Sequence, residues 1–227
     1  MGFDWQWDYS IEILPALLHA TINTVIATFA GFAVAMVLGV VFLAGQRTRY
    51  PLVSWLFREF VEFIRTTPLL VQVFFVFYVG PQFGVLLSPW VAGMTAIGVH
   101  YGAYLSEVYR GGLYAVPKGQ WEACKALNLS PARTYLGIIL PQAFPPCMPG
   151  ISLYLVGCFK DTPVLSVIAV TELLNTASVL GTMTYRYLEP YTIAGLIFLV
   201  LSLITVACLS MAERRLRKML GLPDHRH

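Results

Sequence analysis

The sequence is poor in charged residues. Of its 227 residues only 12% are Asp, Glu, Lys or Arg, whereas 57% are hydrophobic. The mean hydropathy is +0.69. Soluble domains carry about 25% charged residues, because their surfaces face water. The shortage of charge therefore excludes an ordinary soluble domain and places the chain in a lipid bilayer.

Several chemical motifs are also absent. The sequence contains no Gly-rich loop ending in Gly-Lys-Ser or Gly-Lys-Thr, no His-Glu-x-x-His and no Gly-x-Ser-x-Gly. Such motifs hold nucleotide phosphates, a catalytic zinc ion or an esterase serine. We therefore predict that the chain is not an enzyme and binds neither ATP nor a metal itself. Its cysteines, Cys124, Cys147, Cys158 and Cys208, lack the spacing of paired ligands and are expected to be packing residues.

Uncharged runs predict one all-α membrane domain over residues 1–227, with five transmembrane helices. One run is too long for a single crossing, and we divide it near residues 81–88, which contain Gly and Pro. The predicted spans are residues 17–44, 60–80, 89–108, 143–172 with an interruption, and 190–212. No basic segment precedes the first span, so a removable signal peptide is not expected.

The basic residues are distributed unevenly. Thirteen of the 15 lie near the second span, in the loop after the third, or in the tail: Arg47, Arg49, Arg58, Arg65, Arg110, Lys118, Lys125, Arg133, Arg214, Arg215, Arg217, Lys218 and Arg226. By the positive-inside rule these regions are cytoplasmic, which puts the N-terminus outside and the C-terminus in the cytoplasm. Asp4, Asp8 and Glu12 near the N-terminus agree. The charge of +3 thus reflects topology, and no nucleic-acid partner is expected.

A charged pair interrupts the fourth predicted span. Lys160 and Asp161 separate two apolar half-spans, and Thr162-Pro163 can cap and restart a helix. Charges at membrane depth are costly and mark functional sites, and a half-helix N-terminus attracts a carboxylate. Two interpretations of Asp161 stay open. In the first, Asp161 belongs to the substrate path, where it faces the solute's cationic group or pairs with a base such as Lys160. In the second, it only caps the helix.

A charged loop, about residues 110–141, separates the third and fourth spans. Pro117 can occupy the first position of a helix, Asn128 can end it, and Ser130-Pro131 can begin the next one. The sequence therefore predicts a helix, a tight turn and a second helix. Trp121, Cys124 and Leu127 lie along one stripe of the first helix, which either folds back on its own protein or docks onto a partner.

The spacing in this loop resembles the cytoplasmic coupling loop of ABC importer permeases. That pattern is Glu-Ala-Ala, three residues, Gly, nine residues, Ile, one residue, Leu-Pro; here it reads Glu122-Ala123-Cys124, Asn128, Ile138 and Leu140-Pro141. Cys124 replaces Ala and Asn128 replaces Gly, and both exchanges are physically mild. The resemblance implies contact with a partner ATPase through Trp121, Glu122, Ala123, Cys124, Leu127, Asn128 and Pro141.

Residues 65–72, 104–110, 160–165 and 185–191 resemble segments of the polar-amino-acid branch of type I ABC importer permeases. Pro163 departs from the Ser usual there. The resemblance implies a five-helix MetI-like fold and a substrate path, which we assign to Thr67, Pro68, Gln72, His100, Lys160, Asp161, Thr162 and Pro163. His100 either lines this path or bonds to a neighbouring helix, and we favour the bond. Residues 100–101, 120–121 and 185–187 are most similar to permeases for ectoine and hydroxyectoine.

The resemblance also implies partners. These are two ATPase subunits that bind ATP and Mg²⁺, a second homologous or identical permease subunit, and an extracytoplasmic solute-binding protein. The leading hypothesis is the translocation subunit of an importer for polar amino acids or related zwitterions in the bacterial cytoplasmic membrane. The alternative is an ion-coupled secondary transporter using Lys160, Asp161, Glu107 and Glu172. The coupling loop argues against this alternative, and dependence on a co-expressed ATPase would distinguish the two.

Overall fold

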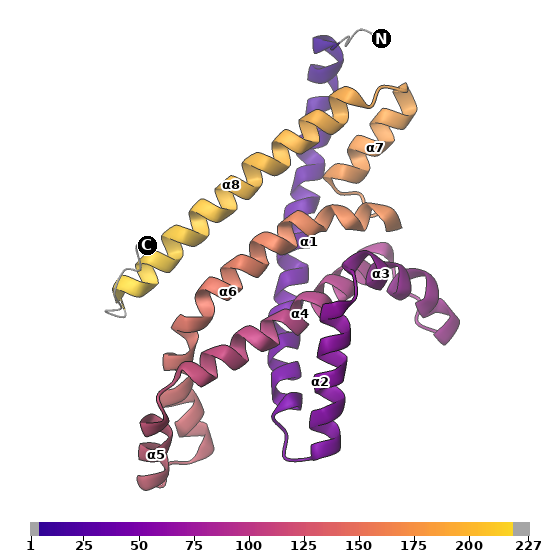
Figure 1. Ribbon diagram of the computed structural model, residues 1–227. Coiled ribbons are helices and arrows are strands. Elements are labelled where there is room, and N and C mark those ends of the chain that lie inside the picture. The colour runs from indigo at the N-terminus through magenta and orange to yellow at the C-terminus, as the bar shows by residue number, and fades with distance from the viewer. Residues whose placement is uncertain (1–4, 220–227) are drawn as a thin grey trace.

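The computed structural model describes residues 5–219, and every regular element in that range is a helix (Figure 1). The elements are α1 Trp7–Gln46, α2 Pro51–Thr66, α3 Leu69–Phe74, η1 Phe75–Val79, η2 Gly80–Phe83, α4 Pro89–Ala115, α5 Lys118–Ala126, η3 Arg133–Ile139, α6 Leu140–Asp161, η4 Thr162–Ile168, α7 Leu173–Thr184 and α8 Leu188–Met219. Elements η1 and η3 are π-helical, and η2 and η4 are 3-10 helices. Asp4, Arg226 and the side chains of Arg217 and Lys218, which entered the topology prediction, lie outside the described part.

Three helices are long and apolar enough to cross a membrane: Trp7–Gln46, Arg133–Ile168 and Leu188–Arg215. A fourth span arises if the bent pair Pro51–Thr66 and Leu69–Phe83 is counted as one. Helix α4, which contains the predicted span 89–108, is not among these candidates, since glycines, tyrosines and charged residues lower its hydropathy. The all-helical membrane architecture is therefore confirmed, and the number five stays a prediction.

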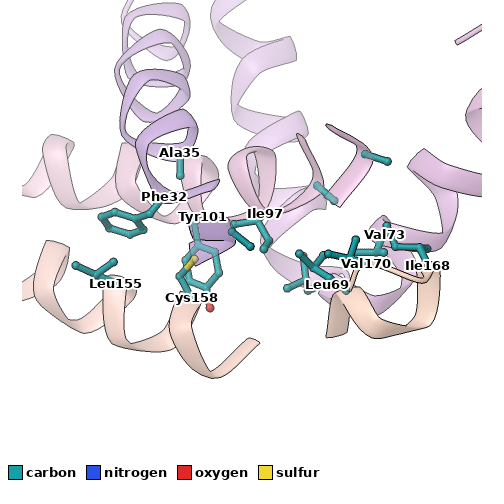
Figure 2. Close-up of a cluster of buried hydrophobic side chains, with 14 of the residues drawn as sticks. Phe32, Ala35, Leu69, Val73, Ile97, Tyr101, Leu155, Cys158, Ile168 and Val170 are labelled. Carbon is teal, nitrogen blue, oxygen red and sulfur yellow. The ribbon is translucent and has the colours of Figure 1, made fainter. Parts of the chain in front are cut away.

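Helices α1 and α4 pack closely at the centre and share one hydrophobic core with α3, α6 and η4 (Figure 2). Phe32 from α1, Ile97 from α4 and Leu155 from α6 are buried there. A Cβ atom on Gly98 would lie 2.4 Å from Val34 Cγ1, and one on Gly102 would lie 2.9 Å from Leu38 Cβ. Small residues let membrane helices approach in this way, because lipid leaves packing as a main force between them.

The second predicted span, residues 60–80, is not one straight helix. The chain bends by 110° between α2 and α3. Thr67 is extended, with φ −102° and ψ 135°, because the ring of Pro68 disfavours a helical residue before it. The Gln72 side chain stabilises the elbow, since its Nε2 donates to the carbonyls of Ile64 at 2.8 Å and Thr67 at 3.0 Å. Pro68 has no N–H to donate to the Ile64 carbonyl, which besides Gln72 accepts only the long bond of 3.4 Å from the Thr67 N–H among the described residues.

The predicted break at Lys160–Asp161 is wrong in position. Helix α6 runs on from Asp161 into η4, and the Thr162 backbone is helical. The Thr162 hydroxyl does not cap a new helix: it donates to the Cys158 carbonyl at 2.9 Å and lies 2.8 Å from Thr28 Oγ1. The chain absorbs Pro163 by tightening into a 3-10 helix. The helix ends instead at Ala169, whose φ is +59°.

Helix α7 was not predicted. Its N-cap is Glu172, whose carboxylate accepts from the backbone N–H groups of Leu174 at 2.9 Å and Asn175 at 2.6 Å. The turn from α7 to α8 then meets the start of α1. Glu189, 1% exposed, is paired with Arg186 and accepts from the Gln6 N–H at 3.2 Å. Tyr9 Oη lies 2.8 Å from Thr184 Oγ1, so the start of α1 is joined to the turn between α7 and α8.

Candidate functional site

The coupling loop folds as a helix, a tight turn and a second helical segment. Asn128 is left-handed at φ +50°, which lets the chain turn after α5 as expected. The Ser130 hydroxyl accepts from the Arg133 N–H at 3.4 Å, as an N-cap does. One detail of the prediction is wrong: Pro117 precedes the first helical residue, Lys118, instead of occupying that position. Pro141 lies one residue inside α6 and is exposed.

The apolar stripe of α5 divides into an inner and an outer part. Cys124 is 3% exposed, and Trp121 packs on the cluster formed by Leu113, Val116, Ile139 and Ala143. These two side chains therefore pack against their own protein, so this part of the helix folds back on the permease. Leu127, in contrast, is 71% exposed, and Glu122 and Ala123 are also exposed. We call the surface formed by Glu122, Ala123 and Leu127 the outer face of α5, because it is the part left uncovered.

Asp161 lies beside an aromatic side chain of α4. Its Oδ2 accepts a hydrogen bond from the Tyr101 hydroxyl at 2.6 Å. Within the described residues it makes no capping hydrogen bond to η4 and no ion pair with Lys160. Lys160 is exposed and takes no part in the hydrogen bond between Tyr101 and Asp161. The geometry therefore contradicts a purely capping role for Asp161.

The His100 side chain serves the elbow. His100 Nδ1 lies 3.1 Å from Gln72 Oε1, and both residues are 8% exposed. Because the Gln72 amide holds two backbone carbonyls at the bend, His100 fixes the orientation of that amide. This arrangement agrees with a bond between neighbouring helices, which the sequence favoured. Thr67 and Pro68 form the elbow itself, so four of the predicted path residues lie together at one structural joint.

A cluster of aromatic rings connects these positions, and the sequence prediction missed it. Tyr101 and Tyr104 lie three residues apart on α4, with ring centroids 6.5 Å apart, and Tyr154 of α6 lies 5.1 Å from Tyr104. The Tyr104 hydroxyl donates to the Arg65 carbonyl at 2.9 Å. The i, i+3 spacing of tyrosines beside His100 was the available signal. This spacing could not reveal the contact of Tyr104 with Arg65, which lies 39 residues earlier.

The comparisons with known proteins agree on one family. Residues 35–218 match the family described as "Binding-protein-dependent transport system inner membrane component". A probable amino-acid ABC transporter permease protein, y4tG, of Sinorhizobium fredii is 45% identical over 98% of both chains. The L-cystine transport system permease protein TcyB of Bacillus subtilis is 34% identical over 95% of this chain and 93% of its own. A crystal structure of an amino acid ABC transporter with histidines superimposes with a TM-score of 0.85 at 29% identity, covering 94% of this chain and all of that one.

Proposed function

Because the chain belongs to the family of binding-protein-dependent transport system inner membrane components, we propose that it is the translocation subunit of an ABC importer for polar amino acids. The observation that carries this proposal is α5. Its inner residues, Trp121 and Cys124, anchor it to the permease, while its outer face presents Glu122 and Leu127 to a partner. A helix held in this way can transmit the movement of an ATPase to the membrane helices.

The proposed assembly has further members. Two ATPase subunits hydrolyse ATP and contact α5, a second permease subunit completes the path, and an extracytoplasmic binding protein delivers the solute. The family description supports a location in a bacterial inner membrane. A polar amino acid is favoured as solute by the names of the relatives and by the chemistry of Asp161 and Tyr101, which suits an ammonium group. Ectoine and hydroxyectoine remain narrower candidates within this zwitterionic class.

Uptake tests the proposal directly. The chain is expressed in a strain lacking its own amino-acid importers, together with the ATPase and binding protein encoded beside it. We expect uptake of at least one labelled solute from a panel of the twenty amino acids and ectoine. A Lys-to-Ala change in the phosphate loop of the ATPase should abolish this uptake. Uptake that survives this change but is lost when an uncoupler collapses the proton gradient would support the ion-coupled alternative instead.

We also propose that the chain crosses the membrane five times, with its N-terminus outside and its C-terminus in the cytoplasm. Helix α5 and the α1–α2 turn lie at one end of the molecule, and the start of α1 and the α7–α8 turn lie at the other (Figure 1). The first of these ends carries Arg47, Arg49, Lys118 and Lys125, which supports a cytoplasmic location.

Cysteine labelling checks this orientation. After the native cysteines are replaced, Gln6→Cys should react with an impermeant thiol reagent in intact cells, whereas Gly119→Cys should react only after the cells are permeabilised. Both positions are exposed, so access to the reagent depends on the side of the membrane. Labelling of Gly119→Cys from outside would reverse the topology and remove α5 from the reach of an ATPase.

A further inference from the structure

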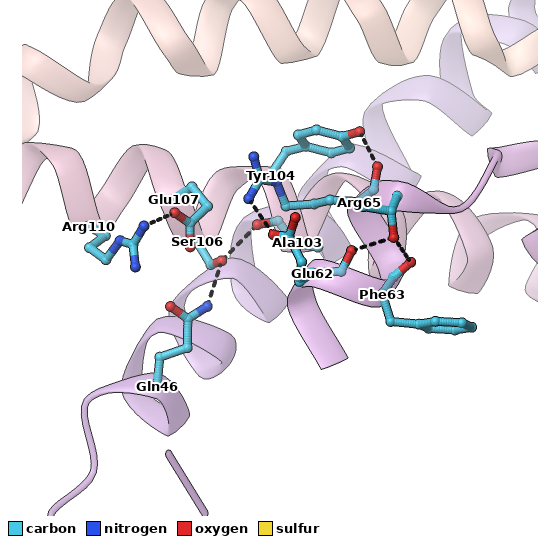
Figure 3. Close-up of polar contacts among 10 residues, drawn as sticks. Gln46, Glu62, Phe63, Arg65, Ala103, Tyr104, Ser106, Glu107 and Arg110 are labelled. Atoms are coloured by element: carbon cyan, nitrogen blue, oxygen red, sulfur yellow. Dashed lines mark hydrogen bonds and ion pairs between the residues drawn. The ribbon is translucent and has the colours of Figure 1, made fainter. Parts of the chain in front are cut away.

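A charged cavity of about 210 Å³ lies between α1, α2 and α4, at the end of the molecule where α1 ends. Six of the residues that line it are charged: Arg58, Glu59, Glu62, Arg65, Glu107 and Arg110. Two ion pairs connect some of them, Arg65 with Glu62 at 3.1 Å and Arg110 with Glu107 (Figure 3). Arg58 and Glu59 are exposed and form no ion pair within the described residues, so both charges are accessible to a ligand.

Two buried polar atoms of the lining residues lack a hydrogen-bond partner within residues 5–219. Gln46 is 3% exposed, and its Nε2 donates to Ser106 Oγ at 3.2 Å, which orients the amide (Figure 3). Its Oε1 is buried and accepts no hydrogen bond from any described residue, and Arg65 Nε is buried without an acceptor in the same range. Buried polar groups are nearly always paired in folded proteins, because an unmet group has lost its water. The acceptor Gln46 Oε1 and the donor Arg65 Nε are thus available to a ligand.

The charge balance indicates what the ligand is. Three guanidinium groups and three carboxylates sum to zero, so the cavity favours neither a net anion nor a net cation. A molecule that carries both charges fits better, since its ammonium can bind a carboxylate while its own carboxylate binds a guanidinium. The volume is that of a small organic molecule.

A chain of side-chain contacts also links the cavity to Asp161. Tyr101, which donates to Asp161, neighbours Tyr104, and the Arg65 guanidinium lies 5.5 Å from the centre of the Tyr104 ring. Tyr104 also donates to the Arg65 carbonyl. Aromatic faces attract cations, as the guanidinium of Arg65 over the Tyr104 ring shows, and these side-chain contacts join the two sites.

We propose that the cavity is a second binding site for the transported zwitterion, occupied after the solute leaves Asp161 and before it is released at the α5 end. This inference rests on the proposed function, because it takes the solute to be an amino acid. Arg58 and Glu59 bind the solute's carboxylate and ammonium, and Gln46 Oε1 accepts a further ammonium hydrogen bond. The opposing explanation is that the charges only hold α2 against α4.

Equilibrium dialysis distinguishes the two explanations. The purified complex of permease and ATPase subunits, without binding protein or ATP, is dialysed against ¹⁴C-labelled L-arginine, L-glutamine and L-cystine in separate experiments. We expect two molecules of the imported amino acid per permease subunit. Asp161→Asn should leave one, and Glu59→Gln or Arg58→Gln should weaken that remaining site by about tenfold.

These two variants break neither ion pair, so a purely structural role predicts no change in binding. Arg47→Gln is the matched control, because it removes a charge at the same end without lining the cavity, and it should bind like the wild type. One molecule per wild-type subunit, or unchanged binding in Glu59→Gln and Arg58→Gln, overturns the inference even if import is intact. Failure of the complete transporter to import any amino acid overturns the proposed function, and this inference with it.

Discussion

Replacing Leu127 by Asp is expected to abolish uptake and to release the ATPase subunits, while the permease is still inserted in the membrane. Leu127 follows α5, is 71% exposed and packs in none of the buried clusters of the described chain. Its apolar side chain is therefore free to enter a pocket of the partner. A buried, unpaired carboxylate at such a central contact costs at least about 2 kcal/mol, or more than about tenfold in affinity.

Co-purification of the ATPase with tagged permease measures this effect, and Glu122→Lys on the same outer face should act in the same direction. Leu86→Asp is a suitable control, because Leu86 is 82% exposed but lies on the loop before α4. Trp121→Asp does not test docking, since Trp121 packs inside the loop and we expect its replacement to unfold α5. Normal recovery of the ATPase with both Leu127→Asp and Glu122→Lys would show that the partner binds elsewhere.

The second large effect is expected at Asp161. Asp161→Asn keeps the shape of the side chain but removes its negative charge, and we expect uptake to fall by roughly tenfold or more. This corresponds to about 1.4 kcal/mol for a lost charge-assisted contact with the solute. The structure allows a sharper comparison than the sequence did. Tyr101→Phe removes the hydrogen bond at 2.6 Å but leaves the carboxylate charged, so its uptake should fall less.

Uptake is measured over a range of solute concentrations, with permease and ATPase quantified in the same membranes. Asp8→Asn, at an exposed position near the start of α1, controls for the simple loss of one acid. If Asp161→Asn transports within about twofold of the wild type at every concentration, Asp161 does not contact the solute. An equal loss in Tyr101→Phe and Asp161→Asn would instead assign the effect to the hydrogen bond that joins α4 to α6.

Local chemistry made the coupling loop predictable. Asn128 tolerates a left-handed backbone and Ser130 has a hydroxyl that can cap, so the two residues decide the turn with little help from distant parts of the chain. The division of the α5 stripe was not predictable in the same way. Trp121 is covered by residues of α4, η3 and α6 that lie up to 22 positions away, and a helical wheel cannot reveal which side of a stripe they cover.

The two Thr-Pro pairs show where local chemistry fails. Thr67-Pro68 bends the chain by 110°, whereas the helix continues through Thr162-Pro163. The difference lies in the hydrogen bonds that surround each pair. Gln72, fixed by His100, takes up the carbonyls released at the first pair. Thr162 instead keeps the helical turn closed, because its hydroxyl bonds to Cys158 and meets Thr28 across 134 residues. Identical dipeptides thus fold differently through contacts that sequence spacing does not encode.

The contact between Gln6 and Glu189 has a consequence for how the protein is made. Gln6 leaves the ribosome 183 residues before the carboxylate that its N–H group binds. The first helix therefore enters the translocon or the lipid without this hydrogen bond, which can form only after α7 and the start of α8 have been synthesised. Glu189 in turn is synthesised three residues after Arg186, its ion-pair partner. In the order of synthesis, the distant partner Gln6 therefore comes first, and the nearby partner Arg186 comes just before Glu189 itself.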